Sequence, residues 1–292
     1  MMEEEQFYEE EIRCGYKVTR KMKQVWAVQL EMLDEVERIC RKYGLKYFAD
    51  SGTLIGAVRH KGYIPWDDDI DLAMLREDYE VFVQVAGKEL QSPLVLQTAY
   101  TEENYLRGHA QLRNSRTTGC NEEDRKAGYN CGIFIDIFPL DGMPEGRRSA
   151  RLWAFFVKML WMLLYIWYRF DYYENATAAG KALNGLGRLL HIPMKKAYSV
   201  YEGLCTLYLG RKTTYVCDTV FIRHLEKNTW KREWFSGTVY MPFENRMIPV
   251  PVGYDGRLKA EYGDYMKPAK APTLHGSLVL EPDVAYKDYL SF

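Results

Sequence analysis

The chain has 292 residues, of which 47% are hydrophobic and 27% are charged, and its formal net charge at pH 7 is -1. These values are ordinary for a globular protein, and the length allows one large domain or two small ones with a substantial core. A nearly balanced charge also argues against wholesale binding to nucleic acid.

The first part of the chain alternates predicted helices and strands. Residues 1–20 are rich in glutamate and are expected to form an acidic tail that passes into a helix. Apolar residues then recur at helical spacing over 21–42, and Gly44 follows as a stop signal. The elements predicted beyond it are strands over 45–50, 69–75, 94–100, 109–115 and 132–140, a turn with a short helix over 51–62, and a helix over 77–90.

Past residue 145 the pattern becomes helical, over about 147–210, and the stretch 237–267 combines turn residues, short strands and a small helix. The simplest organisation is the tail followed by one catalytic domain, 21–292, of the α+β class with a mixed sheet and flanking helices. Its expected parts are a core at about 45–145, a helical region at about 147–235 and a C-terminal segment at about 237–275.

One stretch, "LWAFFVKMLWMLLYIWY" at 152–168, is almost entirely apolar, although Lys158 lies inside it and Arg151 and Arg169 bracket it. A spanning helix needs about 20 apolar residues, and a lysine in mid-membrane costs about 2.5–3.5 kcal/mol on insertion scales. Three interpretations remain open: a buried helix of a soluble fold, a helix in the membrane interface that makes a peripheral contact, and a membrane span.

The six cysteines form no C-x-x-C pair, so we expect reduced thiols in a cytoplasmic protein. Cys120 and Cys131 flank a polar loop and could pair or share a metal. The acidic start of the chain shows no apolar segment typical of a signal peptide. The expected location is therefore the cytoplasm, with the inner face of the membrane as the alternative.

Aspartates dominate "GYIPWDDDIDLAM", residues 62–74, yet apolar residues bound them on both sides. Alternate side chains of a strand share a face. Asp69 and Asp71 are therefore expected to point one way, and Asp136 is a lone carboxylate inside the apolar strand "IFIDIF". If the two strands pair, the three carboxylates meet, and we predict them as the catalytic residues.

Three facing carboxylates are costly, because two unit charges 4 Å apart repel by about 4 kcal/mol at an effective dielectric of about 20. A bound Mg²⁺ or Mn²⁺ removes this penalty, and Mg²⁺ favours carboxylates together with substrate phosphates. The predicted metal ligands are Asp69, Asp71 and Asp136, with Asp67 as a further candidate. Such a site suits in-line displacement at phosphorus.

The turn "DSGTLIG" places Ser51, Gly52 and Thr53 just before a helix. Glycine lets the backbone approach a phosphate, and a helix N-terminus offers free N–H donors. Alone, this turn is equally well an ordinary helix cap. Followed by D-x-D on the next strand and one more aspartate on a later strand, it has the layout of the nucleotidyltransferase fold.

Several other residues are candidate substrate ligands. Arg59, His60 and Lys61 could neutralise a diphosphate or simply balance the neighbouring aspartates. Arg113 is a further candidate, with a surface strand position as the alternative. Trp66 is the aromatic residue nearest in sequence to the aspartates, and aromatic faces bind quaternary ammonium groups such as choline.

The block "YFADSGTLIGAVRHKGYIPWDDDIDLAMLREDYEVF" closely resembles the hallmark of the LicD family, to which fukutin and fukutin-related protein are similar. Two further blocks look like those of the family: "GIFIDIFPLDG" at 132–142 and "PVPVGYDGRLKAEYGDYMKP" at 249–268. The resemblance covers about 20–275 and implies a nucleotidyltransferase-like fold.

The resemblance also implies a reaction, the transfer of a phospho-alcohol group, such as phosphocholine from CDP-choline, to a sugar hydroxyl of a surface glycan with release of CMP. The acceptor would be a lipopolysaccharide or teichoic acid type of glycan, free or lipid-linked. Asp69 and Asp71 would bind the metal, Asp136 would complete the site or act as general base, and Gly52 and Thr53 would hold the diphosphate.

Two other hypotheses remain. A true nucleotidyltransferase would use the same carboxylates to move NMP from an NTP and would release pyrophosphate. A non-catalytic binding module is the third, and the presence of all three carboxylates argues against it.

Overall fold

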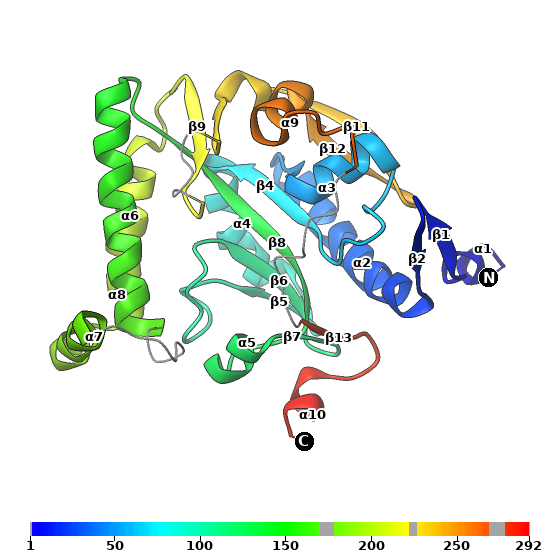
Figure 1. Ribbon diagram of the computed structural model, residues 1–292, viewed down its shortest axis with the longest axis horizontal. Helices are drawn as coiled ribbons and strands as arrows, with labels where there is room; N and C mark the ends of the chain where they lie inside the picture. The colour runs from blue at the N-terminus through cyan, green and yellow to red at the C-terminus, as the bar shows by residue number, and fades with distance from the viewer. Residues whose placement is uncertain (1, 170–177, 222–226, 269–277, 292) are drawn as a thin grey trace.

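The computed structural model describes residues 2–169, 178–221, 227–268 and 278–291 (Figure 1). Within them, a seven-stranded sheet runs in the order β10-β9-β8-β4-β3, with β6 also paired to β8 and β5 paired to β6. The β4–β8 pairing is parallel and the others are antiparallel. The strands are β3 (Phe48–Ala49), β4 (Asp71–Leu75), β5 (Leu94–Gln97), β6 (Ala110–Asn114), β8 (Ile133–Gly142), β9 (Tyr215–Asp218) and β10 (Thr229–Lys231). This mixed sheet with flanking helices confirms the predicted α+β architecture.

Strand β8 is the centre of the sheet and is buried along its whole length. Its apolar side chains alternate between two cores, as the period of a strand requires. Ile135 and Ile137 join Leu72 in the larger core, while Leu140 joins Ala73 in the core on the other face.

Helices α2 (Arg20–Tyr43) and α4 (Arg76–Glu89) cover the face of the larger core. The hydroxyl of Thr19 caps the start of α2, and Gly44 ends it with a left-handed φ of 66°, which a glycine adopts without strain. The apolar stripe predicted for this helix is confirmed, because Trp26, Leu30 and the residues spaced like them are buried.

The predicted helical region forms a layer of three helices at one side of the molecule: α6 (Arg147–Arg169), α7 (Ala178–Leu190) and α8 (Met194–Cys205) (Figure 1). Trp153 and Val157 of α6 pack with Tyr198 and Tyr201 of α8. By length and composition, α6 is the one helix of the described residues that could cross a membrane, but core helices also meet this criterion.

The expected extent of the helical region, to residue 235, was wrong. Residues beyond 214 contribute β9 and β10 to the central sheet, where β9 pairs with the end of β8. The strands are four and three residues long, too short for a period of two to stand out in the sequence. They are stabilised by their neighbours, because Val216 and Trp230 are buried in the core next to β8.

The expected acidic tail was also wrong. Residues 2–18 form helix α1 (Met2–Phe7) and a hairpin of β1 (Glu11–Arg13) and β2 (Tyr16–Val18). Arg13 of the hairpin makes two contacts to the carboxylate of Glu244, at 2.5 and 2.8 Å, and Val18 is buried in the larger core. The tail is therefore held by pairing with a residue far away in sequence.

All six cysteines are free thiols, so the disulfide considered between Cys120 and Cys131 is absent.

Several small elements complete the fold, among them a second hairpin near the C-terminus. The remaining elements are α3 (Ser51–Ile55), the π-helix η1 (Gly56–His60), β7 (Thr118–Cys120), α5 (Glu122–Ala127), the 3₁₀ helices η3 (Thr206–Tyr208) and η5 (Arg232–Phe235), β11 (Thr238–Phe243), β12 (Arg246–Pro251), α9 (Tyr254–Tyr262), β13 (Val279–Glu281) and α10 (Tyr286–Leu290).

Candidate active site

Three carboxylates meet at the start of the parallel strand pair. In the register of β4 and β8, Asp71 lies opposite Asp136. One carboxylate oxygen from each of Asp69, Asp71 and Asp136 lies within 4.8 Å of the others. Strand β4 begins only at Asp71, so Asp69 precedes the strand rather than belonging to it. The structure therefore brings together the three aspartates that the sequence singled out.

The electrostatics of the three carboxylates are unequal. Burial raises the pKa of Asp71 well above its usual value, and the charges of Asp69 and Asp136 raise it further. Burial also pushes the pKa of Asp136 upward, but the charge and hydrogen bond of His109, the charge of Arg107 and a hydrogen bond from Gln111 outweigh it and lower the pKa. The surroundings of Asp136 thus favour its charged form, whereas those of Asp71 disfavour it.

His109 and Gln111 of the neighbouring strand segment were missed by the sequence analysis. The Nε2 atom of His109 lies 3.1 Å from Oδ1 of Asp136, and Nε2 of Gln111 donates to the same oxygen at 2.6 Å. His109 Nδ1 lies 3.2 Å from the carbonyl oxygen of Arg107. Both partners of the ring are oxygen atoms. A usable signal existed, since "HAQLRN" places His109 and Gln111 on one face of a strand.

The carboxylates fit a divalent cation. Mg²⁺ and Mn²⁺ prefer oxygen ligands. Asp71 is surrounded by such ligands, because the charged groups that raise its pKa most are all carboxylates. The partners of Asp136 both hold Oδ1, which orients its carboxylate as outer partners orient metal ligands. A second group of carboxylates, Asp67, Asp68 and Asp69, also has the spacing of a metal site.

The loop before β4 is fastened to helix α2. Trp26 Nε1 donates to the carbonyl oxygen of Asp67 at 3.1 Å, and Gln29 Nε2 donates to that of Asp68 at 2.8 Å. These bonds fix the backbone of the acidic loop while leaving its carboxylates to other partners. Trp66 is half-buried and packs edge-on against Tyr16 of the hairpin, with ring centroids 6.2 Å apart.

The predicted phosphate-binding turn lies against this acidic loop. Ser51 has a left-handed φ of 44°, an uncommon conformation for serine that often marks a functional turn. A Cβ atom on Gly52 would collide with Oδ2 of Asp67, so a larger residue there would have to displace this carboxylate. Thr53 is buried, and its hydroxyl accepts a hydrogen bond of 2.9 Å from the amide of Asp71. Thr53 therefore fixes the start of β4.

The basic cluster after this turn has partners elsewhere in the fold. Nη1 of Arg59 donates to the carbonyl oxygen of Tyr265 at 2.5 Å, and its Nε donates to His60 Nδ1 at 3.3 Å. Burial and the charges of Arg59 and Arg13 lower the pKa of His60. Lys61 is exposed, with a left-handed φ of 58°. Arg59 thus ties the π-helix to the C-terminal segment.

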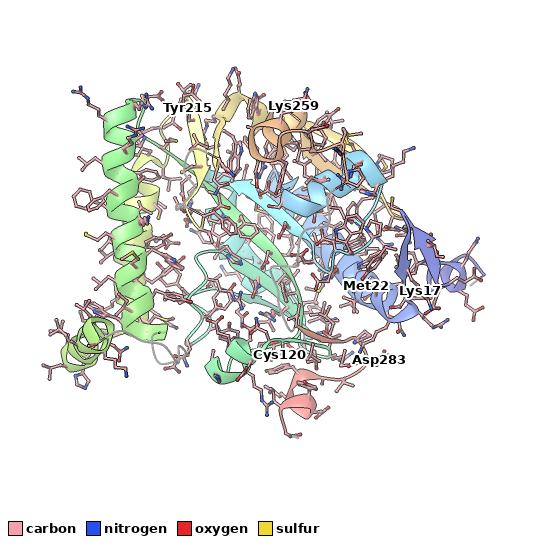
Figure 2. All side chains as sticks on the ribbon, viewed as in Figure 1. Lys17, Met22, Cys120, Tyr215, Lys259 and Asp283 are labelled. Atoms are coloured by element: carbon pink, nitrogen blue, oxygen red, sulfur yellow. The ribbon has the colours of Figure 1, made fainter. Side chains whose placement is uncertain are left out.

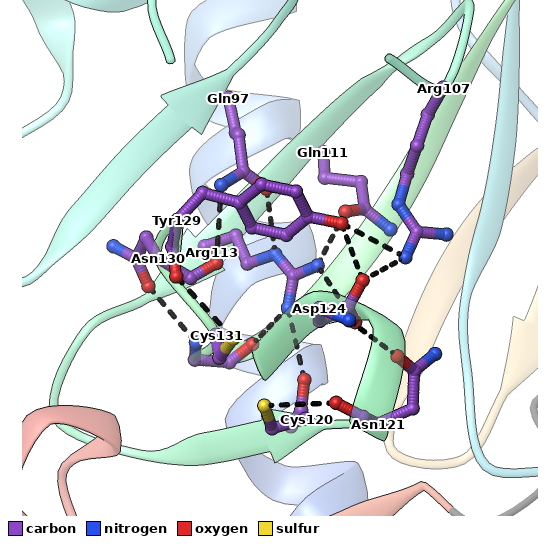
Figure 3. Close-up of polar contacts among 12 residues, drawn as sticks. Gln97, Arg107, Gln111, Arg113, Cys120, Asn121, Asp124, Tyr129, Asn130 and Cys131 are labelled. Atoms are coloured by element: carbon purple, nitrogen blue, oxygen red, sulfur yellow. Dashed lines mark hydrogen bonds and ion pairs between the residues drawn. The ribbon is translucent and has the colours of Figure 1, made fainter. Parts of the chain in front are cut away.

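Arg113 is not a surface residue and does not face solvent as a substrate ligand would, so this prediction was wrong. Its side chain is fully buried and donates to Gln97, Gln111 and two backbone carbonyl groups (Figure 3). A guanidinium has five donors in a planar fork, and here they are used to join β5, β6 and the loop before β8. Arg113 acts on the site through Gln111, the partner of Asp136.

Further charged residues are buried in or next to strands of the central sheet. Asp141, in a block whose role the sequence did not reveal, accepts two hydrogen bonds from Arg76 at 2.7 and 2.9 Å. Asp50 forms a buried ion pair with Arg257, yet burial raises its pKa to about 6. Burial, and then the charge of Asp50, raise the pKa of Asp218 to about 8.

Carboxylates gathered where two paired strands begin, with a glycine turn beside them, are typical of enzymes that act on phosphate groups with a divalent cation. Comparison with known proteins narrows this class. Residues 44–156 match the family model described as LicD/FKTN/FKRP, nucleotidyltransferase domain. The chain is 30% identical over 267 residues to the lipopolysaccharide cholinephosphotransferase LicD of Haemophilus influenzae, covering 86% of this chain and 92% of that protein. The chain therefore belongs to the LicD family.

Other similarities are shorter and cover less than a fifth of the chain each. Human ribitol 5-phosphate transferase FKRP is 44% identical over 46 residues, which is 16% of this chain and 9% of that protein. An uncharacterised protein of Rickettsia typhi, RT0683, is 42% identical over 55 residues, or 19% of this chain and 18% of that protein. Relatives with named activities are thus transferases of phosphorylated alcohols.

Proposed function

We propose that this protein transfers a phospho-alcohol group, with phosphocholine from CDP-choline as the favoured case, to a sugar hydroxyl of a cell-surface glycan and releases CMP. We further propose a nucleotidyltransferase-like fold for its core. The observation that carries the proposal is the cluster of Asp69, Asp71 and Asp136 within 4.8 Å in a chain that aligns with a cholinephosphotransferase over most of its length.

In the proposed reaction, the sugar oxygen forms a bond to the phosphorus that carries the alcohol, and the bond from this phosphorus to the CMP oxygen breaks. The hydroxyl proton passes to a carboxylate of the cluster. A divalent cation held by Asp69, Asp71 and Asp136 would neutralise charge on the phosphate oxygens. The lowered pKa of Asp136 and its two hydrogen bonds favour a ligand role for it over that of general base.

An aromatic cluster beside Asp136 supports choline as the alcohol. Phe138 follows Asp136 on the same face of β8, and its ring centroid lies 4.4 Å from that of His109 and 5.8 Å from that of Phe221. Phe221 is 43% exposed, so an aromatic surface faces solvent close to the carboxylates. Aromatic faces attract quaternary ammonium groups, which suits Phe221 better to this role than Trp66, whose ring packs against Tyr16.

The test is ³¹P NMR of the purified protein with Mg²⁺ and a glycan acceptor, offered CDP-choline, CDP-ethanolamine, CDP-ribitol and the four NTPs in turn. We expect CMP and a new phosphodiester from CDP-choline. Asp69→Asn should abolish both, whereas Asp288→Asn, at an exposed carboxylate of α10, should leave them unchanged. Pyrophosphate from an NTP would contradict the proposal and indicate nucleotidyl transfer.

A further inference from the structure

The polarity of helix α7 is opposite to that of a helix on the surface of a globular protein. The side that packs on α6 carries small and polar residues. Asn184 is buried and its Nδ2 donates to the carbonyl oxygens of Ile166 and Trp167 at 2.8 and 3.2 Å. A Cβ atom on Gly187 would collide with the ring of Trp167. Four leucines of α7 are exposed instead, Leu189 by 73%; they are Leu183, Leu186, Leu189 and Leu190.

Helix α6 also has an apolar stripe on its outer side. Leu152, Phe155, Met159 and Met162 recur at helical spacing, and Leu152 and Phe155 are each 59% exposed. Figure 2 shows side chains of α6 and α7 extending away from the rest of the molecule. We call these four residues and the four exposed leucines of α7 the outer face. Exposed apolar surfaces of this kind mark sites of interaction.

The charge of this layer is opposite to that of the rest of the chain. Residues 147–214 contain 11 Lys and Arg against 3 Asp and Glu, a net charge of +8 in a chain whose total is -1. Exposed basic residues lie next to the outer face in sequence, among them Arg151, Lys158, Lys181, Lys195 and Lys196. Two copies of this layer would therefore repel each other, whereas an anionic surface would attract it.

We propose that the outer face of α6 and α7 docks on the surface of an anionic lipid bilayer. Apolar side chains would enter the boundary between headgroups and acyl chains while lysine and arginine contact lipid phosphates. The helices lie on the membrane and do not span it, because the other side of α6 is occupied. Trp153 Nε1 donates to the carbonyl oxygen of Leu204 at 2.9 Å, and Val157 is fully buried against α8. This inference does not depend on the proposed function.

The test is flotation of the full chain with vesicles of phosphatidylcholine alone or mixed with one third phosphatidylglycerol. We expect binding to the mixed vesicles at least about tenfold tighter than to phosphatidylcholine, and weakened by salt. The double change Leu186→Ser with Leu190→Ser should reduce binding about tenfold or more. Lys195→Glu with Lys196→Glu should remove the preference for anionic lipid. Met247→Ser alters a 54% exposed methionine on β12 and serves as the matched control, with binding unchanged.

Circular dichroism of each variant checks that the helices persist, as expected for substitutions at exposed positions. The proposal is overturned if the chain fails to float with the mixed vesicles, or if Met247→Ser weakens binding as much as the leucine changes do. It is also overturned if the chain is a stable dimer that the leucine changes dissociate, because a second copy would then cover the outer face.

Discussion

Replacing Arg113 by lysine tests whether Arg113 stabilises the fold or binds the substrate. The guanidinium makes four hydrogen bonds, to Gln97 at 2.9 Å, to Gln111 at 2.6 Å, and to the carbonyl oxygens of Gly119 and Gly132 at 3.0 and 2.8 Å. A lysine ammonium is a single point with three donors, so it can replace the two backbone contacts but not both glutamine contacts. With charged hydrogen bonds worth about 1.5–3 kcal/mol each, the loss of one glutamine contact should lower the free energy of unfolding by about 1.5–3 kcal/mol.

Urea denaturation measures this loss, and steady-state kinetics with CDP-choline provide a second readout. Because Gln111 holds Asp136, we expect kcat to fall in Arg113→Lys while KM for the donor changes little. Arg116→Lys, three residues on and exposed, should change neither quantity. The reasoning would be refuted if Arg113→Lys unfolded at the wild-type urea concentration but showed a raised KM, because Arg113 would then be a substrate ligand.

Two further predictions concern the turn and a buried carboxyl group. Gly52→Ala should lower activity strongly, because the new Cβ would displace the carboxylate of Asp67. The control is Gly87→Ala, which has open space around the added atom and should be neutral or slightly stabilising. Equal activity of the two variants would contradict this prediction. Burial raises the pKa of Asp218 from its ordinary value of 3.8 to about 8. The folded state therefore retains a proton that the unfolded state releases, and stability falls as pH rises from about 4 to 8. Asp218→Asn keeps an acceptor for the amide of Val220. Urea denaturation should show this variant to be more stable than wild type by several kcal/mol at pH 8 but not at pH 4. Parallel pH profiles of stability would disprove the raised pKa of Asp218.

The meeting of Asp71 with Asp136 could be predicted from the sequence because both lie in or next to strongly apolar strands. The period of two in a strand determines which face each side chain lies on. Because carboxylates in apolar sequence are electrostatically unfavourable, their presence indicates a shared metal site. The glycine turn was predictable for a similar reason. A backbone that must approach another group closely requires glycine, and Gly52 does approach Asp67.

Other features depend on partners that lie far away in the sequence. Arg113 was taken for a ligand because its acceptors, such as Gln97 and the carbonyl group of Gly132, lie 16 and 19 residues away in sequence. His109 was missed because its role comes from pairing β6 with β8 in one particular register. Similarly, β9 exists because the end of β8 offers it an edge to pair with.

The central claim is that Asp69, Asp71 and Asp136 act together as one site for a divalent cation. Thermal unfolding of the wild type and of Asp71→Asn, each with EDTA or with Mg²⁺, tests it most directly. Without metal, Asp71→Asn should unfold at a higher temperature, because one of the repelling charges is gone. Mg²⁺ at about 100 times its Kd should stabilise the wild type by about 2.7 kcal/mol and the variant much less. Equal stabilisation of both proteins by Mg²⁺, or of neither, would contradict the account.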